Sequence, residues 1–122
     1  MEMKGVFDSN ILIDYLKGIK TAAVEINRFE SKNISIISYI EVLVGVEMDD
    51  AIFSQVKAFL HSFNIITVNT NIADLTIAAR KTYKLKIPDA IILATAQSLE
   101  ALLITRNTKD FSVQNPAVSV PY

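Results

Sequence analysis

The sequence predicts an α/β fold in three layers, with a central parallel sheet of four to five strands and helices on both faces. Short apolar or β-branched runs, typical of buried strands, alternate with segments whose apolar residues recur at helical spacing. This alternation continues along the whole chain and favours parallel strands that are joined by helices. The chain has 122 residues, of which 51% are hydrophobic. These values fit one well-buried domain over residues 1–122.

The first half of the chain contains two predicted strands and three predicted helices. Apolar residues at helical spacing follow the first strand until Gly18, a residue suited to closing a helix. Ser38 and Glu41 have the spacing of a capping box, in which the two side chains bond to the start of their own helix. The predicted strands are residues 5–7 and 33–37, and the predicted helices are residues 11–17, 22–29 and 38–47.

The second half continues the alternation with two clear strands and one weak edge strand. Asn71 can cap a long helix that reaches Tyr83, and Pro88 suits the first turn of the next helix. That next helix is apolar almost all round, so we expect it to be central. The predicted strands are residues 63–68, 101–105 and 117–120, and the predicted helices are residues 50–61, 71–83 and 88–99.

Several classes of protein and of site are disfavoured. No apolar run reaches the about 18 residues of a membrane span. The amino-terminal residues lack the charged leader and the cleavage signal of a secreted protein. The chain has no cysteine, so it can form neither disulfides nor thiolate metal sites. We therefore expect a cytoplasmic protein that does not bind a membrane.

The charge of the molecule as a whole does not favour binding to a polyanion, because the net charge is −1. A nucleic acid would have to be attracted by local basic patches or by a bound cation. The first of two candidate patches fits a solvated helix face equally well. The patches are Arg80, Lys81, Lys84 and Lys86 in one cluster, and Arg106 with Lys109 in another.

Acidic and polar residues follow the predicted strands at the points where ligands bind in parallel α/β sheets. Asp8 comes directly after the first strand, while Thr105, Asn107 and Asp110 come at or after the fourth. Parallel strands bring their carboxyl ends to the same edge, and the binding crevice lies beyond that edge. We therefore expect these side chains to meet.

Each acid also has a purely structural explanation. Asp8 can cap the following helix, Glu41 can belong to the capping box, and Asp89 lies in a first helical turn, where the dipole favours negative charge. Asp110 can cap a turn. Taken together, however, converging carboxylates about 4 Å apart repel by about 4 kcal/mol at an effective dielectric of about 20. A hard cation such as Mg²⁺ or Mn²⁺ would relieve that repulsion.

Four segments resemble the PIN-domain ribonucleases, and within that family most closely the VapC-type toxins of prokaryotic toxin–antitoxin pairs. They occur in the order and spacing of the family, and the resemblance covers essentially the whole chain. The segments are FDSNILIDYL (residues 7–16), SIISYIEVLVG (residues 35–45), IPDAIILATAQ (residues 87–97) and LLITRNTKDF (residues 102–111).

The resemblance implies a PIN-like fold and an endoribonuclease that hydrolyses RNA phosphodiester bonds with one or two Mg²⁺ or Mn²⁺ ions. Asp8, Glu41 and Asp89 match the first three acids of the family, and Asp110 would supply the fourth. The principal metal ligands would be Asp8 and Asp89.

The resemblance also implies polar residues that support these acids. Thr105 and Asn107 would hold the acids or ordered water by hydrogen bonds, and Asn10 would brace the loop of Asp8. Asn107 stands where many relatives carry an aspartate. Asp14 is expected to face solvent, and His61 is expected to be structural or on the surface.

The partners implied by the resemblance are an RNA substrate, a small antitoxin protein and a second copy of the chain in a homodimer. The apolar early helices could contribute to both protein interfaces. Aromatic side chains such as Tyr15, Tyr39 and Phe111 could stack on RNA bases, although their helical spacing favours a place in the core.

Three alternatives stay open. The chain could be a PIN-like binding module without catalysis, or a PIN nuclease that processes RNA outside a toxin–antitoxin pair. A receiver domain or an aspartate-nucleophile phosphohydrolase is disfavoured. The receiver's phosphoacceptor acid is absent from Val68–Thr70, and Asn10 stands where the phosphohydrolases usually have a second acid.

Overall fold

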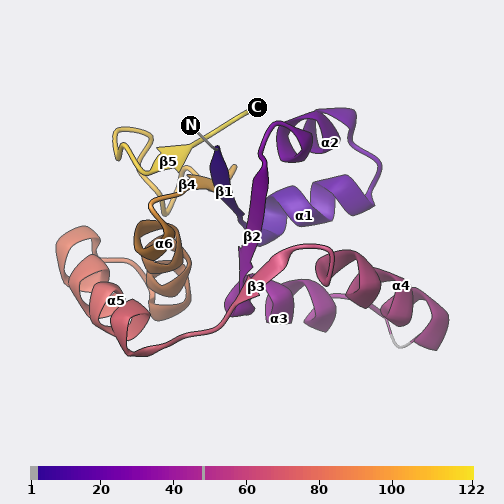
Figure 1. Cartoon of the computed structure of the whole chain (residues 1–122), viewed down its shortest axis with the longest axis horizontal. Coiled ribbons are helices and arrows are strands. Elements are labelled where there is room, and N and C mark those ends of the chain that lie inside the picture. The colour runs from indigo at the N-terminus through magenta and orange to yellow at the C-terminus, as the bar shows by residue number, and fades with distance from the viewer. Residues whose placement is uncertain (1–2, 48) are drawn as a thin grey trace.

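The computed structural model describes residues 3–47 and 49–122 and confirms the predicted α/β architecture (Figure 1). Strands and helices alternate along the described chain. Within these ranges, no helix combines the length and the apolar character needed to cross a bilayer. The strands are β1 (Lys4–Phe7), β2 (Ser31–Ser35), β3 (Asn64–Ile66), β4 (Leu102–Ile104) and β5 (Val118–Ser119). The helices are α1 (Ser9–Leu16), α2 (Lys20–Asn27), α3 (Ile36–Val44), α4 (Asp50–Leu60), α5 (Thr70–Tyr83) and α6 (Ile87–Leu99).

The five strands form one parallel sheet in the order β3-β2-β1-β4-β5. The weak edge strand predicted near the end of the chain is therefore present as β5. In the register of the central pair, Phe7 of β1 lies opposite Ile104 of β4. The residues that follow these two strands are consequently neighbours at the carboxyl edge of the sheet, although they are far apart in the sequence.

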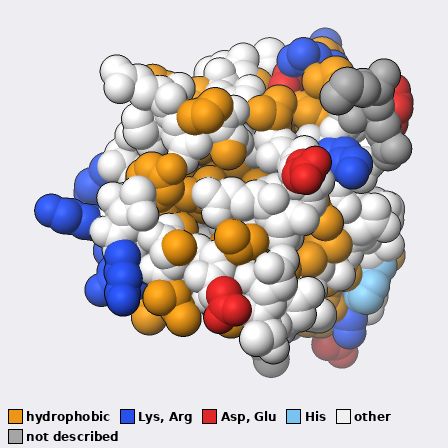
Figure 2. Space-filling view, turned by 60° about the vertical axis from the view of Figure 1, so that its left-hand side comes forward, with side chains coloured by type: hydrophobic (Ala, Val, Ile, Leu, Met, Phe, Trp, Pro, Cys, Tyr) orange, Lys and Arg blue, Asp and Glu red, His pale blue; other side chains and the backbone are white. Residues whose placement is uncertain are grey.

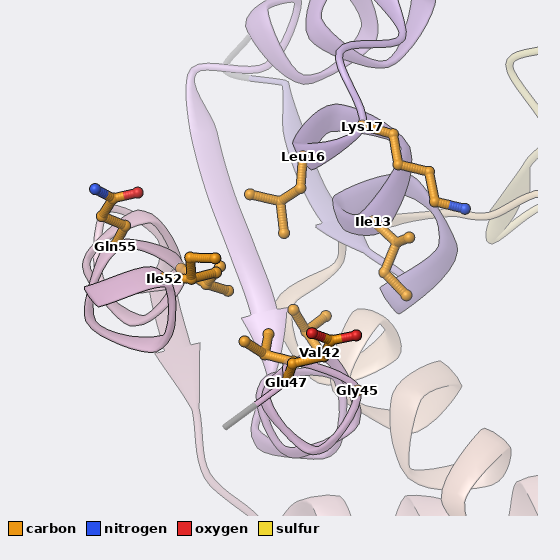
Figure 3. Close-up of a pocket in the computed structure, with 10 residues that line it drawn as sticks. Ile13, Leu16, Lys17, Val42, Gly45, Glu47, Ile52 and Gln55 are labelled. Atoms are coloured by element: carbon orange, nitrogen blue, oxygen red, sulfur yellow. The ribbon is translucent and has the colours of Figure 1, made fainter. Parts of the chain in front are cut away.

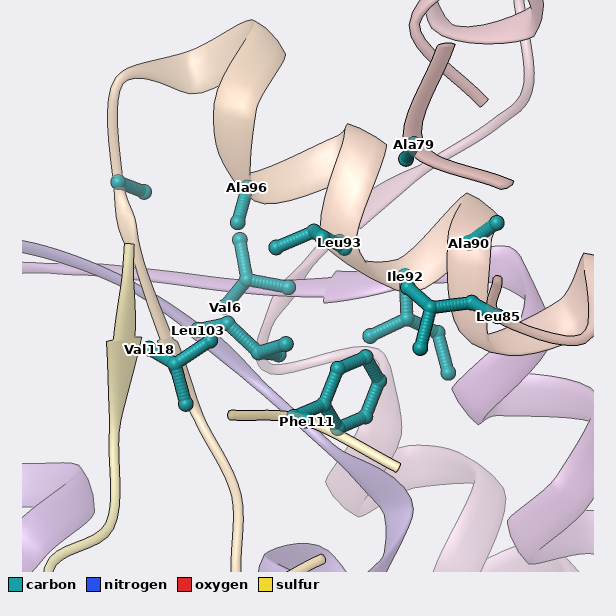
Figure 4. Packing of buried hydrophobic residues seen from close by; sticks show 11 residues of the cluster. Val6, Ala79, Leu85, Ala90, Ile92, Leu93, Ala96, Leu103, Phe111 and Val118 are labelled. Carbon is teal, nitrogen blue, oxygen red and sulfur yellow. The ribbon is translucent and has the colours of Figure 1, made fainter. Parts of the chain in front are cut away.

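Helices cover the sheet on both faces, which confirms the three layers (Figure 1). Successive residues of a strand point to opposite faces, so β1 and β4 contribute to two separate hydrophobic clusters. Val6 and Leu103 pack with residues of α5 and α6 on one face (Figure 4). Phe7 and Ile104 pack with residues of α1, α2 and α4 on the other.

The start of α3 differs from the prediction because a local cap ends the preceding strand early. The side chain of Ser35 accepts a hydrogen bond from the Ile37 backbone N–H at 3.1 Å. This N-cap places the helix start at Ile36, so the expected strand at residues 33–37 ends at Ser35. The predicted capping box is wrong, because Ser38 lies inside the helix rather than at its N-cap.

Two further boundaries differ from the prediction. The long helix α5 is capped by Asn69, whose side chain accepts from the Ile72 N–H at 2.8 Å, and not by Asn71. The strand expected at residues 63–68 is shortened to Asn64–Ile66. At the end of α1, by contrast, Gly18 has a φ of 81°, the left-handed conformation that glycine adopts most easily.

Candidate metal and nucleic-acid site

Asp8 lies at the junction between β1 and α1 and serves the local structure as well as the candidate site. It is the N-cap of α1, and its Oδ1 accepts a hydrogen bond from the Ser9 N–H at 2.8 Å. Its backbone N–H donates to the Ile104 carbonyl at 2.9 Å, which ties it to the neighbouring strand. Only 4% of the residue is exposed. The helix cap therefore holds a buried carboxylate at the carboxyl edge of the sheet.

The second oxygen of Asp8 is held from the opposite end of the sequence. The Thr105 hydroxyl donates to Oδ2 at 2.7 Å, and the Asn10 amide donates to the same oxygen at 3.3 Å. Asn10 also contacts the Thr105 hydroxyl at 3.3 Å. The structure thus brings together three of the residues that the sequence indicated. The parallel register of β1 and β4 is the reason.

Asp110 is held within the loop that follows β4. The Asn107 side-chain amide donates to Asp110 Oδ2 at 2.9 Å, and the Asp110 N–H returns a bond to Asn107 Oδ1 at 3.2 Å. The Asn107 N–H donates to the Thr105 hydroxyl at 2.9 Å. Thr105 therefore links the carboxylate of Asp8 to the loop that carries Asp110.

Glu41 and Asp89 approach the same region from two helices. Burial raises the pKa of Glu41, and the charges of Asp8 and Asp89 raise it further. Burial also raises the pKa of Asp89, followed by the charges of Asp110 and Asp8, while Lys86 opposes this rise. The charge of Asp8 therefore acts on both Glu41 and Asp89, and the charge of Asp110 acts on Asp89. These four carboxylates are named here the acidic site.

The pKa of Asp8 itself is raised because burial disfavours its charged form. The hydrogen bonds from Thr105, Ser9 and Asn10 act in the opposite direction and favour the carboxylate. Asp8 is therefore a desolvated acid with its hydrogen-bond donors already in place. A nearby cation would act in the same direction as these donors.

The donor set fits a hard divalent ion that keeps part of its water. All four candidate ligands offer carboxylate oxygens, which Mg²⁺ and Mn²⁺ prefer. In the described ranges, no group of three or more histidine, cysteine, aspartate or glutamate side chains is arranged to enclose a metal ion. Mg²⁺ does not need such a cage, since proteins usually bind it through one or two carboxylates, waters and substrate phosphates.

The prediction for Asp14 is wrong, because its side chain is buried. It was expected to face solvent, but only 4% of the residue is exposed. Its carboxylate pairs with the Arg106 guanidinium at 2.6 Å and accepts from the Tyr122 hydroxyl at 2.9 Å. Asp14 lies four residues after Asn10 and thus on the same helix face, a signal that could have placed it near the site. The sequence offered no comparable signal for Tyr122.

The other candidate residues remain on the surface. Arg80, Lys81, Lys84, Lys86 and Lys109 are exposed, although the Arg80 guanidinium donates to the Leu85 carbonyl. His61 is exposed and contacts the Tyr39 hydroxyl at 3.3 Å, as expected for a structural or surface residue.

The aromatic residues considered for RNA stacking differ in how far they are buried. Phe111 is 2% exposed and belongs to the core cluster that packs against α5 and α6. Tyr15 stacks on Phe59 with ring centroids 4.7 Å apart. The expected place in the core is confirmed for Phe111, whereas Tyr15 packs on a neighbouring ring but stays 39% exposed.

Two apolar grooves lie away from the four acids. The first, about 550 Å³, lies between α1, α3 and α4, where Ile13, Leu16, Val42 and Ile52 line it (Figure 3). The second, about 360 Å³, lies between α5 and α6. Figure 2, which brings the α5–α6 side forward, shows exposed hydrophobic side chains with lysine and arginine side chains at one edge.

Comparisons with known proteins agree with this architecture. A family model described as PIN domain matches residues 5–114. A search of curated protein sequences finds no match. Among solved structures, a toxin–antitoxin complex from Klebsiella pneumoniae contains a chain with 43% identity to this one. The match covers 98% of each chain with a TM-score of 0.89.

Two more distant structures have the same fold. A chain of VapBC-1 from nontypeable Haemophilus influenzae is 25% identical, with coverage of 89% of this chain and 90% of that chain and a TM-score of 0.75. A chain of VapBC2 from Rickettsia felis, bound to a DNA fragment from its promoter, is 19% identical. There the coverage is 96% of this chain and 98% of that chain, with a TM-score of 0.81.

Proposed function

Because this chain belongs to the PIN domain family, we propose that it is an endoribonuclease that uses Mg²⁺ or Mn²⁺ and acts as the toxin of a toxin–antitoxin pair. The observation that carries the proposal is that burial raises the pKa of Glu41 and of Asp89, and that the charge of Asp8 raises both further, joined at Asp89 by the charge of Asp110. A divalent ion bound there would activate water and offset negative charge on the phosphate.

The proposed ligands differ in how firmly the protein holds them. Asp8 is buried and hydrogen-bonded through both oxygens, so its position is set before an ion arrives. Asp89 lies in the first turn of α6. We assign these two as the principal ligands, with Glu41 and Asp110 completing the ion's surroundings directly or through water.

Three polar residues hold the carboxylates of Asp8 and Asp110 in position by hydrogen bonds. Thr105 donates to the Asp8 carboxylate and therefore favours its ionised form, which is the form that binds a cation. Asn10 supports the same oxygen, and Asn107 orients Asp110. These three residues position the proposed ligands without being ligands themselves.

The proposed substrate is RNA, drawn to the site by exposed basic residues. In the basic cluster at residues 80–86, Lys86 is close enough to Asp89 for its charge to lower the pKa of that acid. Lys86 is therefore suited to contact a phosphate next to the acidic site. The positive surface would be extended by Arg80, Lys81, Lys84 and Lys109.

The proposed protein partner is a small antitoxin. Support comes from the Klebsiella pneumoniae toxin–antitoxin complex, whose matching chain is 43% identical to this one over 98% of its length. The groove between α1, α3 and α4 offers an apolar surface on which a partner segment could pack. A basic side chain of the partner that reached the four acids would occupy the place of the cation and inhibit cleavage.

We also propose that the chain forms a homodimer through the groove between α5 and α6. Ile77 and Ile87 are each 56% exposed there. Asp74, Ile77 and Lys81 lie on one face of α5. Two antiparallel copies of this helix would place Asp74 of one copy near Lys81 of the other, so the surface is complementary to itself.

The decisive experiment uses the purified chain without an antitoxin. We expect cleavage of RNA with Mg²⁺ or Mn²⁺, loss of cleavage with EDTA, and little cleavage of single-stranded DNA of the same sequence. The antitoxin of the Klebsiella pneumoniae complex should inhibit the reaction. Asp8→Asn, purified in parallel, controls for a contaminating nuclease. Intact RNA under every metal condition would contradict the proposed activity.

A further inference from the structure

An ion pair between a buried carboxylate and a partly exposed arginine lies beside the acidic site without belonging to it. The Arg106 guanidinium meets the Asp14 carboxylate through two hydrogen bonds, Nε to Oδ2 at 2.6 Å and Nη2 to Oδ1 at 3.1 Å. The Asp14 side chain is 6% exposed and that of Arg106 is 41% exposed. A buried carboxylate without a partner is strongly unfavourable, so this contact defines where the Arg106 side chain lies.

The same arginine is joined to the acidic site through its backbone. Arg106 follows Thr105 directly, and its N–H donates to Asn10 Oδ1 at 3.1 Å. The Asn10 amide in turn donates to Asp8 Oδ2. Asn10 and Asp14 lie one turn apart on the same face of α1. That face therefore holds residue 106 at two points, through its main chain and through its side chain.

Tyr122 adds a third contact from the segment that follows β5. Its hydroxyl donates to Asp14 Oδ2 at 2.9 Å, and its ring centroid lies 5.8 Å from the Arg106 guanidinium carbon, within cation–π distance. Burial raises the pKa of Tyr122 to about 12, with further contributions from the hydrogen bond and charge of Asp14. The phenol therefore keeps its proton and remains a donor at neutral pH.

We propose that Asp14, Arg106 and Tyr122, named here the Asp14 cluster, hold the 105–110 loop against α1 and so set the position of Thr105 and Asp110 relative to Asp8. These are positioning residues, since none of them is assigned a contact with the ion or the substrate. The proposal rests on the proposed nuclease function for its effect on catalysis. The proposal also gives Arg106 a positioning role in place of the RNA contact that its positive charge had suggested.

The proposal predicts a defect in metal use rather than in RNA binding. A loosened 105–110 loop would bring Asp110 to the ion less often and would let Thr105 hold Asp8 less firmly, so a higher metal concentration would be needed. Loss of a residue that supports a metal ligand typically reduces metal affinity about 10- to 100-fold. Saturating metal should restore most of the cleavage rate, and the KM for RNA should stay unchanged.

Two conservative variants test this, each with a matched control. Arg106→Lys keeps the charge but cannot make the two-point contact, and Arg28→Lys changes the comparable pair that Arg28 forms with the buried Glu25. Tyr122→Phe removes one hydroxyl bond but keeps the ring, and Tyr39→Phe removes the hydroxyl that contacts His61. The readouts are the Mn²⁺ concentration for half-maximal cleavage, kcat and KM for RNA, and amide exchange of residues 105–110 without metal.

We expect Arg106→Lys to raise the half-maximal Mn²⁺ concentration at least about 10-fold, Tyr122→Phe to raise it less, and both to speed amide exchange in the 105–110 loop. The control variants should match the wild type. A higher KM with an unchanged metal requirement would make Arg106 an RNA contact and overturn the proposal. A lower melting temperature alone, with metal requirement and loop exchange unchanged, would also overturn it.

The exchange measurement keeps the inference distinct from the proposed activity. If the wild type cleaves no RNA, the nuclease assignment fails, but the exchange rates still decide whether the Asp14 cluster holds the loop. Faster exchange confined to residues 105–110 in both variants would support the cluster's role. Unchanged exchange would refute it.

Discussion

The Thr105 hydroxyl donates a hydrogen bond of 2.7 Å to Oδ2 of Asp8, across 97 residues of sequence. Thr105 has no exposed surface and Asp8 has 4%. A hydrogen bond from a hydroxyl to a carboxylate is stronger when the carboxylate is charged than when it is neutral. This bond joins the ends of the two central strands and favours the ionised form of the acid that we assign as a principal metal ligand.

Removing this hydroxyl should weaken metal binding. Thr105→Val has a similar shape but leaves Asp8 Oδ2 without its shortest donor, and it also removes the acceptor used by the Asn107 N–H. We expect the metal concentration for half-maximal cleavage to rise about 10- to 100-fold. Thr105→Ser, which keeps the hydroxyl, should stay close to wild type. Equal losses in both variants would indicate that packing, rather than the hydrogen bond, matters.

Replacing the buried acid should separate activity from stability. Asp8→Asn retains a side chain able to cap α1 but lacks the charge, so we expect RNA cleavage to fall by more than about 100-fold, beyond the loss of a merely supporting residue. Without metal, its melting temperature should equal or exceed that of the wild type, because a desolvated charge is gone. A fully active variant would remove Asp8 from the mechanism.

The raised pKa values predict how stability depends on pH. Asp8, Glu41 and Asp89 each have a pKa above the ordinary value when the protein is folded. At a pH between the ordinary pKa of such a group and its folded-state pKa, the folded protein therefore binds more protons than the unfolded protein. Through that window, their contribution to the free energy of unfolding falls as pH rises, and it is lowest above the folded-state pKa.

Thermal unfolding of metal-free protein checks this dependence. The melting temperature of Asp8→Asn relative to wild type should be highest near pH 7 and should decline toward about pH 4, the ordinary carboxyl range. Added Mg²⁺ should stabilise the wild type at pH 7 and progressively less as protons compete for the acids. Stabilisation by Mg²⁺ that is the same at both pH values would contradict cation binding by these carboxylates.

The basic cluster can be tested through the salt dependence of RNA binding. Lys86→Ala should weaken binding and reduce the slope of log affinity against log salt by about 0.7, the value for one lost phosphate contact on a single strand. The catalytically inactive Asp8→Asn background allows RNA binding to be measured without cleavage. Lys4→Ala is the control, because Lys4 is exposed at the opposite end of β1. Equal slopes for both lysine variants would exclude Lys86 as a contact.

The proposed homodimer can be tested at the groove between α5 and α6. Ile77→Glu would place a charge in the apolar contact and add to the negative charge of Asp74 one turn away, so we expect a monomer by light scattering. Val24→Glu, on α2 and 63% exposed, should not change the assembly. A wild-type chain that is monomeric at all concentrations would rule out the dimer.

Periodicity and cap-forming residues were enough to predict the strand and helix order, the parallel sheet and the three layers. The meeting of Asp8 and Thr105 also followed, because parallel strands bring the residues after them to one edge. The contact of Asn10 with Asp8 was expected from the family resemblance. Boundaries were less predictable, since several residues compete to cap the same helix. Ser35 and Asn69 became caps, whereas Ser38 and Asn71 had been expected.

The α/β order and the residues that follow the central strands can be read from the sequence, because helix and strand periods are local and the rule for parallel sheets depends on topology alone. The burial and pairing of Asp14, by contrast, depend on how the chain packs in three dimensions. Its partners, Arg106 and Tyr122, are 92 and 108 residues away, and no local pattern encodes such a contact. Whether a polar side chain faces water or a partner depends on which distant segment packs over it.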